Sequence, residues 1–417
     1  MPSLESLPKT TFSQYGFPAA GGPWSYQILP EPALSYELTR LAGLETIGNV
    51  SCVSLQPSQI PEHRSQDRYV VHQWNLSGGT WKFAAVFDGH GGEETAEHIV
   101  EALPLIIQGS LCTAISTTGG QLSPAIVSDI LAQSITLADE GITNDLLGLF
   151  PGGPDAIAKL SDDEIRAVIN DQATGGKNNA KVLRCMRGST ALVSLVDPQG
   201  QNLWVASLGD CQAVLGIKST SGKWSTSILS ANHNGADASE VARIHSEHAD
   251  EAECVLRNRV LGAIAVTRAI GDHLFKLPSI YTERVFKNCS PGFRLSTPLN
   301  DFIGRNKTPP YLSNMADVRH VDISSSITAD RFLIMCSDGL VDLYMCDNTR
   351  TGTLQTFAEG WVNLIGGAGS QNSFSDGALR LLRDALGGDD EDRVAQMLTV
   401  EMGMKWMDDT TVLVQPL

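Results

Sequence analysis

The chain has 417 residues, of which 42% are hydrophobic and 18% are charged, and its net charge is −17. This composition is typical of a globular protein and excludes a largely disordered chain. No cluster of Lys and Arg offsets the negative charge, so neither nucleic acid nor an anionic membrane surface is expected as a partner. The eight cysteines form no C-x-x-C pair, which favours free thiols in a reducing, intracellular compartment.

The first residues are rich in Pro, Ser and Gly, so 1–45 are predicted to be an N-terminal extension and 46–417 one large domain. The extension has no apolar signal-peptide core and mixes acidic with basic residues, so it gives no clear transit peptide and leaves the cytoplasm and the mitochondrion as alternatives. No apolar stretch is expected to be long enough to span a bilayer.

Short apolar and β-branched runs predict strands, in chain order, at 81–87, 190–196, 203–207, 332–336 and 411–414. Helices are predicted at 93–107, at 239–248 behind an Asp237–Glu240 capping box, and at 375–386 before a Gly-Gly end. The short turn at 197–200 favours antiparallel pairing of the strands that it joins. Three polar or irregular stretches are predicted to be insertions, at about 114–124, at 146–179 and, as a long flap, at 273–310.

Several predicted strands begin or end at an Asp that lies next to a small residue. Each such dipeptide alone is usually only a turn, but here they recur as Asp88-Gly89, Gly209-Asp210, Asp338-Gly339 and Asp408-Asp409, with Asp67 before another apolar run. If the strands share a sheet edge, the carboxylates converge, and they repel one another unless a cation holds them. An all-oxygen donor set suits Mg²⁺ or Mn²⁺ better than zinc.

Two such cations side by side would make a phosphate-ester hydrolase. Asp88 would bridge them and Gly89 would offer its carbonyl oxygen. His90 would stand beside the leaving oxygen as a general acid, which is ordinary work for an imidazole near neutral pH.

Taken together, the motifs resemble the metal-dependent protein serine/threonine phosphatases of type 2C. The matching segments follow the order of that family over about residues 50–417: SQDRYVV (65–71), FAAVFDGHGG (83–92), RGSTALVSLV (187–196), LWVASLGDCQAVLG (203–216), VTRAIGDHLFK (266–276), FLIMCSDGLVDL (332–343) and DDTTVLV (408–414). The resemblance implies an α+β fold, a four-layer α-β-β-α sandwich of two antiparallel sheets flanked by helices.

The resemblance also implies roles for single residues. Asp88 and Gly89 would hold two cations together, Asp338 and Asp408 would complete one site, and Asp67 would serve the other through water. Gln66 and Asp409 would lie in the outer shell, Asp210 and Asp342 would join Asp338 around a third, weaker cation, and His90 would be the general acid.

Three positions depart from the family pattern. Gln66 stands where Glu is usual, and Gly209-Asp210-Cys211-Gln212 replaces the usual G-D-S-R. Glu62 occupies the place of an Arg that holds the substrate phosphate in many members. Arg64 is the expected substitute, with Arg187 as the less favoured alternative, because a bidentate Arg–phosphate contact contributes to substrate affinity.

A narrower resemblance, to the pyruvate dehydrogenase phosphatase branch, is carried by residues 229–248, 308–321 and 381–401. That branch also lacks the phosphate-binding Arg at the position of Glu62. It implies a phosphoprotein substrate, a mitochondrial dehydrogenase subunit, and we expect the chain to be a monomer.

Other singled-out residues have structural interpretations. His233 is expected to hold a turn, Arg268 and Asp272 to form a buried bracket, Thr190 to open a strand near the site, and Cys211 to be a buried thiol; Met397, Met402, Met404 and Met407 are expected to pack on the core. Two other functions stay open. One is a catalytically weak or inactive scaffold that binds phosphoproteins, suggested by the three departures. The other is a small-molecule phosphohydrolase, although no P-loop motif is present.

Overall fold

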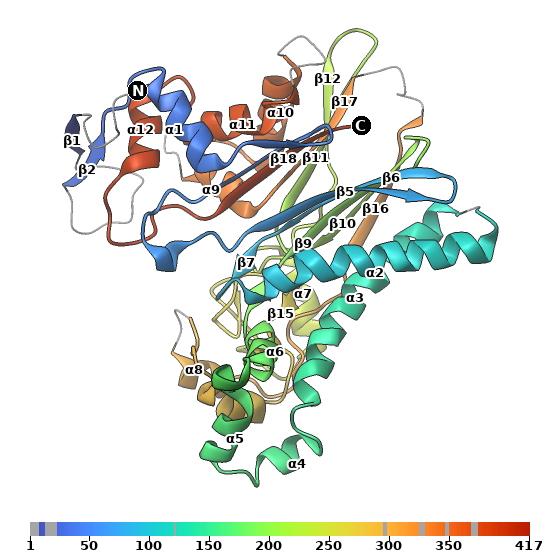
Figure 1. Ribbon diagram of the computed structural model, residues 1–417, viewed down its shortest axis with the longest axis vertical. Coiled ribbons are helices and arrows are strands. Elements are labelled where there is room, and N and C mark those ends of the chain that lie inside the picture. Colours follow the sequence, from blue (N-terminus) through green and yellow to red (C-terminus); the bar gives the residue numbers. More distant parts are fainter. Residues whose placement is uncertain are drawn as a thin grey trace. The chain divides into compact units, whose positions relative to one another are not determined.

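The computed structural model describes residues 8–12, 23–120, 122–294, 298–324, 330–346, 350–367 and 374–417. The chain forms two compact units (Figure 1), and each unit is built from segments that are far apart in the sequence. The first unit comprises Met1–Asp67, Gln212–Leu229 and Ile323–Leu417, and the second comprises Arg68–Cys211 and Ser230–Asp322. Each unit has its own main sheet and its own hydrophobic core.

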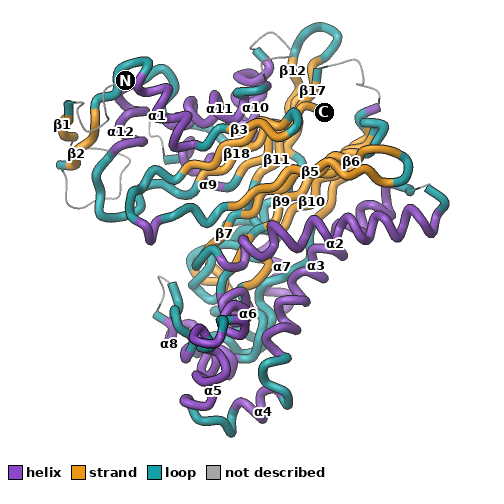
Figure 2. The backbone as a smooth tube through the Cα atoms, viewed as in Figure 1, coloured by secondary structure: helices purple, strands orange, loops and turns teal. Residues whose placement is uncertain are grey.

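The first unit contains a six-stranded antiparallel sheet. Its strands, in spatial order, are β12 (Trp224–Ile228), β11 (Gln212–Lys218), β17 (Arg331–Cys336), β18 (Thr410–Pro416), β4 (Val50–Leu55) and β3 (Glu45–Ile47). Its helices are α1 (Ala33–Ala42), α9 (Asp338–Met345), α10 (Leu354–Gly366), α11 (Gly377–Leu386) and α12 (Glu391–Thr399). Helices α1, α9, α10 and α11 contact the sheet, and α12 packs on α1 and α11 (Figure 2). Alternate residues of the strands, such as Val53, Ile334 and Val412, join these helices in one core.

The described part of the predicted N-terminal extension is integrated into the first unit. Strands β1 (Lys9–Phe12) and β2 (Trp24–Gln27) pair with each other, and the Gln27 backbone N–H donates to Thr399 Oγ1 at 3.0 Å. Helix α1 buries Leu34, Leu38 and Ala42 in the core, at the spacing of one helical face. Part of the predicted extension is therefore packed on the core. The Pro- and Ser-rich composition of residues 1–45 conceals this short amphipathic helix.

The second unit contains a five-stranded antiparallel sheet. Its strands, in spatial order, are β16 (Asp317–Asp322), β10 (Asn202–Leu208), β9 (Ala191–Val196), β6 (Gly79–Phe87) and β5 (Arg68–Leu76). A smaller sheet has the order β15 (Ile270–Gly271), β8 (Gly188–Ser189), β7 (Gly89–His90), and β13 (Val255–Leu256) pairs with β14 (Arg259–Val260). Helices α2 (Glu94–Thr118) and α3 (Pro124–Leu147) pack on the five-stranded sheet and on each other.

All five predicted strands are present, and residues 197–200 join β9 to β10 in an antiparallel pair as predicted. The predicted α+β class, with antiparallel sheets and helices packed on them, is confirmed. The fold positions the site residues because β6, β10 and β17 each end at one of the acidic motifs, and β18 begins at another.

The three predicted insertions are more regular than their composition indicates. Helix α2 continues through Pro104 to Thr118 because its apolar stripe continues through Leu111 and Ile115. Residues 146–179 hold the end of α3, then α4 (Gly153–Ile157), α5 (Asp162–Ile169), η3 (Gln172–Thr174) and the start of α6 (Lys177–Met186). The described residues of the expected flap, 273–294 and 298–310, contain four short helical turns: η4 (His273–Phe275), η5 (Tyr281–Val285), η6 (Phe286–Asn288) and α8 (Leu299–Ile303). Phe275, Phe286 and Phe302 are fully buried there, so the segment is part of the core.

The prediction that no stretch is long enough to span a bilayer is wrong by the criterion of length and composition, because α2 satisfies it. One face of this helix, including Ile99, Leu103 and Ile107, is buried in the core of the second unit. This is the packing of a core helix on a sheet.

Helix α7 (Ala238–Glu247) begins at Asp237, whose carboxylate accepts hydrogen bonds from the backbone N–H groups of Ser239 and Glu240 at 2.8 and 3.2 Å. The predicted cap is present, but the Glu240 side chain does not complete a capping box. It turns inward and is 4% exposed.

The Glu240 carboxylate accepts from Arg268 at 2.6 Å, from Thr267 Oγ1 at 2.6 Å and from Arg243 at 2.8 Å. Arg268 thus pairs with Glu240, and the expected bracket between Arg268 and Asp272 is wrong. Burial alone would raise the pKa of Glu240, but the bonds from Arg268, Arg243 and Thr267 outweigh it and hold this pKa far below the ordinary value of 4.5.

We expect Glu240→Gln to lower the free energy of unfolding by about 3 kcal/mol at pH 7, because it removes the buried carboxylate that pairs with the half-buried guanidinium groups of Arg268 and Arg243. The folded-state pKa is depressed, so the contribution is complete above the unfolded pKa of 4.5 and is lost as the pH falls towards the folded value. Urea unfolding between pH 7 and pH 3 should show the gap between wild type and variant closing.

Glu247→Gln is the matched control on the same helix. Glu247 pairs with Arg243 at 2.9 Å, but its side chain is 48% exposed, so the loss should stay below about 1 kcal/mol. Equal losses in both variants, or a loss for Glu240→Gln that does not change with pH, would contradict a stabilising role of the ionised Glu240 carboxylate.

Candidate active site

Three carboxylates gather in the first unit where β17 ends and β18 begins. Asp338 is the first residue of α9, Asp342 lies one turn later, and Asp408 precedes β18; one oxygen of each lies within 4.8 Å of one oxygen of the others. The antiparallel pairing of β17 with β18, with Cys336 opposite Val412, brings these ends together. The expectation that these acidic motifs converge therefore holds for this part of the set.

The glycine after Asp338 is required by the same junction. A Cβ on Gly339 would lie 2.1 Å from the backbone oxygen of Asp409, which is far inside van der Waals contact. The Asp-Gly motif is thus more than a turn signal, because it lets the start of α9 lie against the chain that leads into β18.

Asp409 is buried and fixes the segments around the cluster. It is 3% exposed, and it accepts hydrogen bonds from the Gln66 backbone N–H at 2.9 Å and from Gln56 Nε2 at 2.8 Å. Asp409 also pairs with Lys405 at 3.0 Å. Asp409 thus holds the segment before Asp67 against the start of β18.

Asp67, like Asp409, is a buried carboxylate of the first unit. It is 4% exposed, and Ser337 Oγ donates to its Oδ2 at 2.7 Å. Burial, and after it the negative charge of Asp409, raises the pKa of Asp67 to about 7. A positive charge nearby would favour the ionised form.

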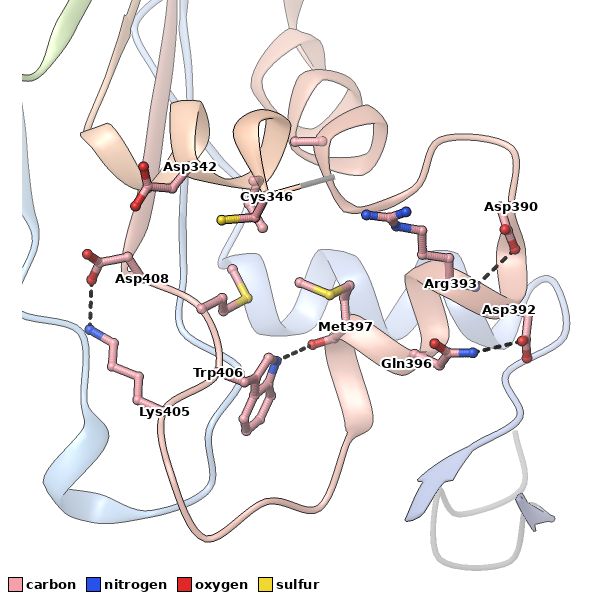
Figure 3. Close-up of a pocket in the computed structure, with 14 residues that line it drawn as sticks. Asp342, Cys346, Asp390, Asp392, Arg393, Gln396, Met397, Lys405, Trp406 and Asp408 are labelled. Atoms are coloured by element: carbon pink, nitrogen blue, oxygen red, sulfur yellow. Dashed lines mark hydrogen bonds and ion pairs between the residues drawn. The ribbon is translucent and has the colours of Figure 1, made fainter. Parts of the chain in front are cut away.

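Lys405 supplies one positive charge at the edge of the cluster and binds Asp408 at 3.0 Å (Figure 3). Burial alone would lower the pKa of Lys405, but Asp408 and Asp409 outweigh it and raise this pKa. Asp342 and Asp408 also line a cavity of about 530 Å³, together with Met397, Trp406 and other residues of α9, α12 and the segment before β18. The cluster of oxygen donors is thus open to a ligand and fits a hard divalent cation.

The second unit holds the other predicted acidic motifs. Asp88 follows β6, its backbone N–H donates to Thr190 Oγ1 at 3.0 Å, and its carbonyl oxygen accepts from the Thr190 N–H at 2.9 Å. Asp210, after β10, accepts from Asn234 Nδ2 at 2.7 Å, and one of its oxygens lies within 4.8 Å of an Asp88 oxygen. Thr190 therefore anchors the backbone of the FDGHGG turn as well as opening a strand.

His90 lies in the small sheet of the second unit, next to Asp272, which was expected to pair with Arg268. His90 pairs with Gly188 across β7 and β8, while Gly271, the residue before Asp272, pairs with Gly188 on the other side. His90 Nε2 and Asp272 Oδ2 lie 2.5 Å apart, with the two side chains 28% and 5% exposed. A Cβ on Gly188 would lie 2.0 Å from His90 Nε2 and 2.1 Å from Asp272 Oδ2, so only glycine leaves room for the pair.

The two candidates for the missing phosphate-binding arginine differ in exposure. Arg64 is exposed at the end of η2 (Pro61–His63), and Glu62 is exposed in the same turn. Arg187 is 1% exposed, donates to the Gly292 carbonyl at 2.9 Å and lies 3.4 Å from Glu94. Burial lowers the pKa of Arg187. Of the two side chains, only that of Arg64 is accessible from solvent.

The remaining interpretations mostly hold. His233 is 2% exposed, accepts from the Gly209 N–H at 3.2 Å and lies 2.8 Å from Asp317, so it is structural. Cys211 is a buried thiol beside Thr190. Met402 and Met407 are buried and Met397 packs against the same core, but Met404 is 41% exposed and does not belong to it.

Asp272 was not predicted from the sequence as the partner of His90. A signal was present, because Gly271-Asp272 has the same form as Gly209-Asp210 at the end of a strand. The strand before it, β15, has only two residues and no recognisable run, so the dipeptide was assigned to a bracket with the neighbouring Arg268.

Comparisons with known proteins agree with the motifs. Residues 148–349 match the family model described as protein phosphatase 2C. A protein phosphatase 2C homolog from Schizosaccharomyces pombe is 26% identical over 374 residues, which cover 84% of this chain and 76% of that protein. Human mitochondrial pyruvate dehydrogenase (acetyl-transferring) phosphatase 2 is 29% identical over 283 residues, and the bovine phosphatase 1 is 32% identical over 268 residues.

The matched regions cover 60% and 57% of this chain, and 51% and 49% of those two phosphatases, so the chain spans about half their length. Among solved structures, the crystal structure of serine-threonine phosphatase 2C from Toxoplasma gondii aligns over 99% of this chain and 100% of that chain. The TM-score is 0.51 and the identity is 13%, so this likeness concerns the fold.

We expect Asp338→Asn to weaken Mn²⁺ binding at least tenfold, because it removes a charge from a cluster of three carboxylates and even outer-shell changes cost about 10- to 100-fold in metal affinity. Calorimetric titration of metal-stripped protein measures the effect. Asp389→Asn is the control, since Asp389 is exposed and outside the cluster. An unchanged Mn²⁺ affinity in Asp338→Asn would show that the cluster is not a cation site.

Proposed function

We propose that this chain, whose residues 148–349 match the family model described as protein phosphatase 2C, hydrolyses phosphoserine and phosphothreonine in proteins with a water activated by two divalent cations. The family match and the curated relatives support the resemblance to this family and the class of enzyme, a protein serine/threonine phosphatase. Dependence on Mg²⁺ or Mn²⁺ is general in the family. The observation that carries the proposal is the cluster of Asp338, Asp342 and Asp408.

We assign the cation ligands as the resemblance implies. Asp338 and Asp408 would hold one cation and Asp67 the other through water, with Asp88 bridging them and the Gly89 carbonyl as a further ligand. Asp210 and Asp342 would complete a third, weaker site with Asp338. When bound, the cations lower the pKa of a water and neutralise charge on the phosphoryl oxygens.

The chain's own groups have separate tasks in this scheme. Asp409 holds Gln66 and Lys405 in place, which supports Asp67 and Asp408. The water oxygen bonds to phosphorus as the bond from phosphorus to the Ser or Thr oxygen breaks. The electron pair stays on that leaving oxygen, which takes a proton from His90 acting as general acid.

The proposed substrate is a phosphorylated subunit of a mitochondrial dehydrogenase, and the proposed location is the mitochondrion. The support is that several curated relatives are mitochondrial pyruvate dehydrogenase phosphatases. Arg64 is the proposed contact for the substrate phosphate because it is exposed, whereas Arg187 is buried. A monomeric state stays a prediction.

The scaffold alternative receives less support from the site. Gln66 lacks the negative charge of the usual Glu, and Glu62 stands where many members of the family have a phosphate-binding Arg. Asp338, Asp342 and Asp408 nevertheless form a compact cluster. An inactive scaffold has no need to hold three carboxylates within 4.8 Å of one another.

We expect wild-type protein with millimolar Mn²⁺ to release phosphate from a phosphothreonine peptide, and to lose this activity when the metal is chelated. Asp338→Asn should lower kcat/KM at least 100-fold, because electrostatic stabilisation of the transition state is commonly the largest catalytic contribution. Malachite-green assay of released phosphate measures both.

Asp389→Asn is the control and should retain wild-type activity. Comparison of the phosphopeptide with nucleotide and sugar phosphates tests the small-molecule alternative, which a preference for these compounds would favour. Metal binding without turnover of any of the three substrates would move the scaffold function to first place.

A further inference from the structure

The strongest unassigned feature is the contact between His90 and Asp272. The two residues are 182 positions apart, yet His90 Nε2 and Asp272 Oδ2 lie 2.5 Å apart within the second unit. Asp272 is nearly inaccessible while His90 is partly exposed. One ring nitrogen is therefore held from the protein side, and the exposed part of the ring can face a ligand.

The position of Asp272 is fixed by its backbone. Asp272 has a φ of 51°, in the left-handed region, and its backbone N–H donates to the Arg187 carbonyl oxygen at 2.8 Å. Asp and Asn tolerate this conformation better than most other side chains. The carboxylate that meets His90 is thus set by a conformation that few residues adopt.

Gly188 lies between the backbone segments that carry His90 and Asp272. It belongs to the middle strand of the small sheet and pairs with His90 and with Gly271. Because a Cβ at this position would overlap both polar atoms of the pair, the sheet is shaped around the hydrogen bond. A chance surface contact would not require a glycine between its partners.

We infer that Asp272 is a positioning residue for the general acid. By accepting the Nε2 hydrogen of His90, it fixes the orientation of the ring that gives a proton to the leaving oxygen. A carboxylate that orients a catalytic imidazole is a recurring arrangement in acid–base catalysis. The inference rests on the proposed phosphatase function and adds to it a residue outside the cation ligands.

The test exploits the basicity of the leaving oxygen. A Ser or Thr alkoxide needs a proton as it leaves, whereas p-nitrophenolate is stable as an anion, so only the first depends strongly on a general acid. Asp272→Asn keeps a residue that tolerates the left-handed backbone. We expect it to lower kcat 10- to 100-fold on the phosphothreonine peptide and less than about threefold on p-nitrophenyl phosphate.

Two further variants sharpen the result. His90→Gln should show the same split between substrates, and the double variant should be no worse than His90→Gln alone, because the pair acts as a unit. Asp317→Asn is the matched control: Asp317 lies 2.8 Å from Nε2 of His233, a buried histidine of the same unit, and both substrates should be turned over as by wild type.

An activity-independent readout uses metal-free wild-type protein. Proton–nitrogen NMR of the nine histidines, with His90 assigned by its loss in His90→Gln, should show a hydrogen on Nε2 shifted downfield by a strong hydrogen bond, and Asp272→Asn should remove that shift. An Nε2 without a hydrogen, or equal losses of kcat on both substrates, would overturn the inference. Absence of turnover by wild type would count against the proposed function, while the NMR result would still decide whether the pair exists.

Discussion

The first unit is organised around the mutual repulsion of carboxylates. Antiparallel pairing of β17 with β18 brings Asp338 and Asp408 to adjacent chain ends, and α9 adds Asp342 one turn later. Like charges this close disfavour their ionised forms unless positive charge offsets them. Lys405 supplies one positive charge by pairing with Asp408 and Asp409. The carboxylate oxygens of the cluster suit a divalent cation, which would supply more. Buried Asp409 connects the surrounding segments by accepting from Gln56 and Gln66.

In the second unit, the contact with Asp272 restrains the orientation of the His90 imidazole. Its small sheet uses two-residue strands from three distant segments, so side-chain packing along long strands cannot supply the precision. Hydrogen bonds and close approach supply it. Thr190 accepts a hydrogen bond from the backbone N–H of Asp88, and Gly188 leaves room for the side chains of His90 and Asp272. The left-handed backbone conformation of Asp272 sets the direction of its carboxylate.

Much of this could be predicted from sequence where the signal was local. Each of the five strands predicted from an apolar run is present. The acidic cluster could be predicted because its Asp residues lie at strand ends, and because a glycine is needed where the backbone approaches another segment closely. The partner of His90 was missed, because β15 has only two residues and its Gly271-Asp272 end could not be recognised as the end of a strand. The helical character of 146–179 and the burial of Phe275, Phe286 and Phe302 were missed because glycine content and polarity describe a segment and not its packing.

The small sheet also has a consequence for folding kinetics. His90 and Asp272 are separated by 182 residues, and the two-residue strands that bring them together have little stability of their own. Closing so long a loop carries an entropic cost before any contact repays it. The pair should therefore form only after α2, α3 and α6 have packed, so its appearance marks the completion of the second unit and not an early nucleus.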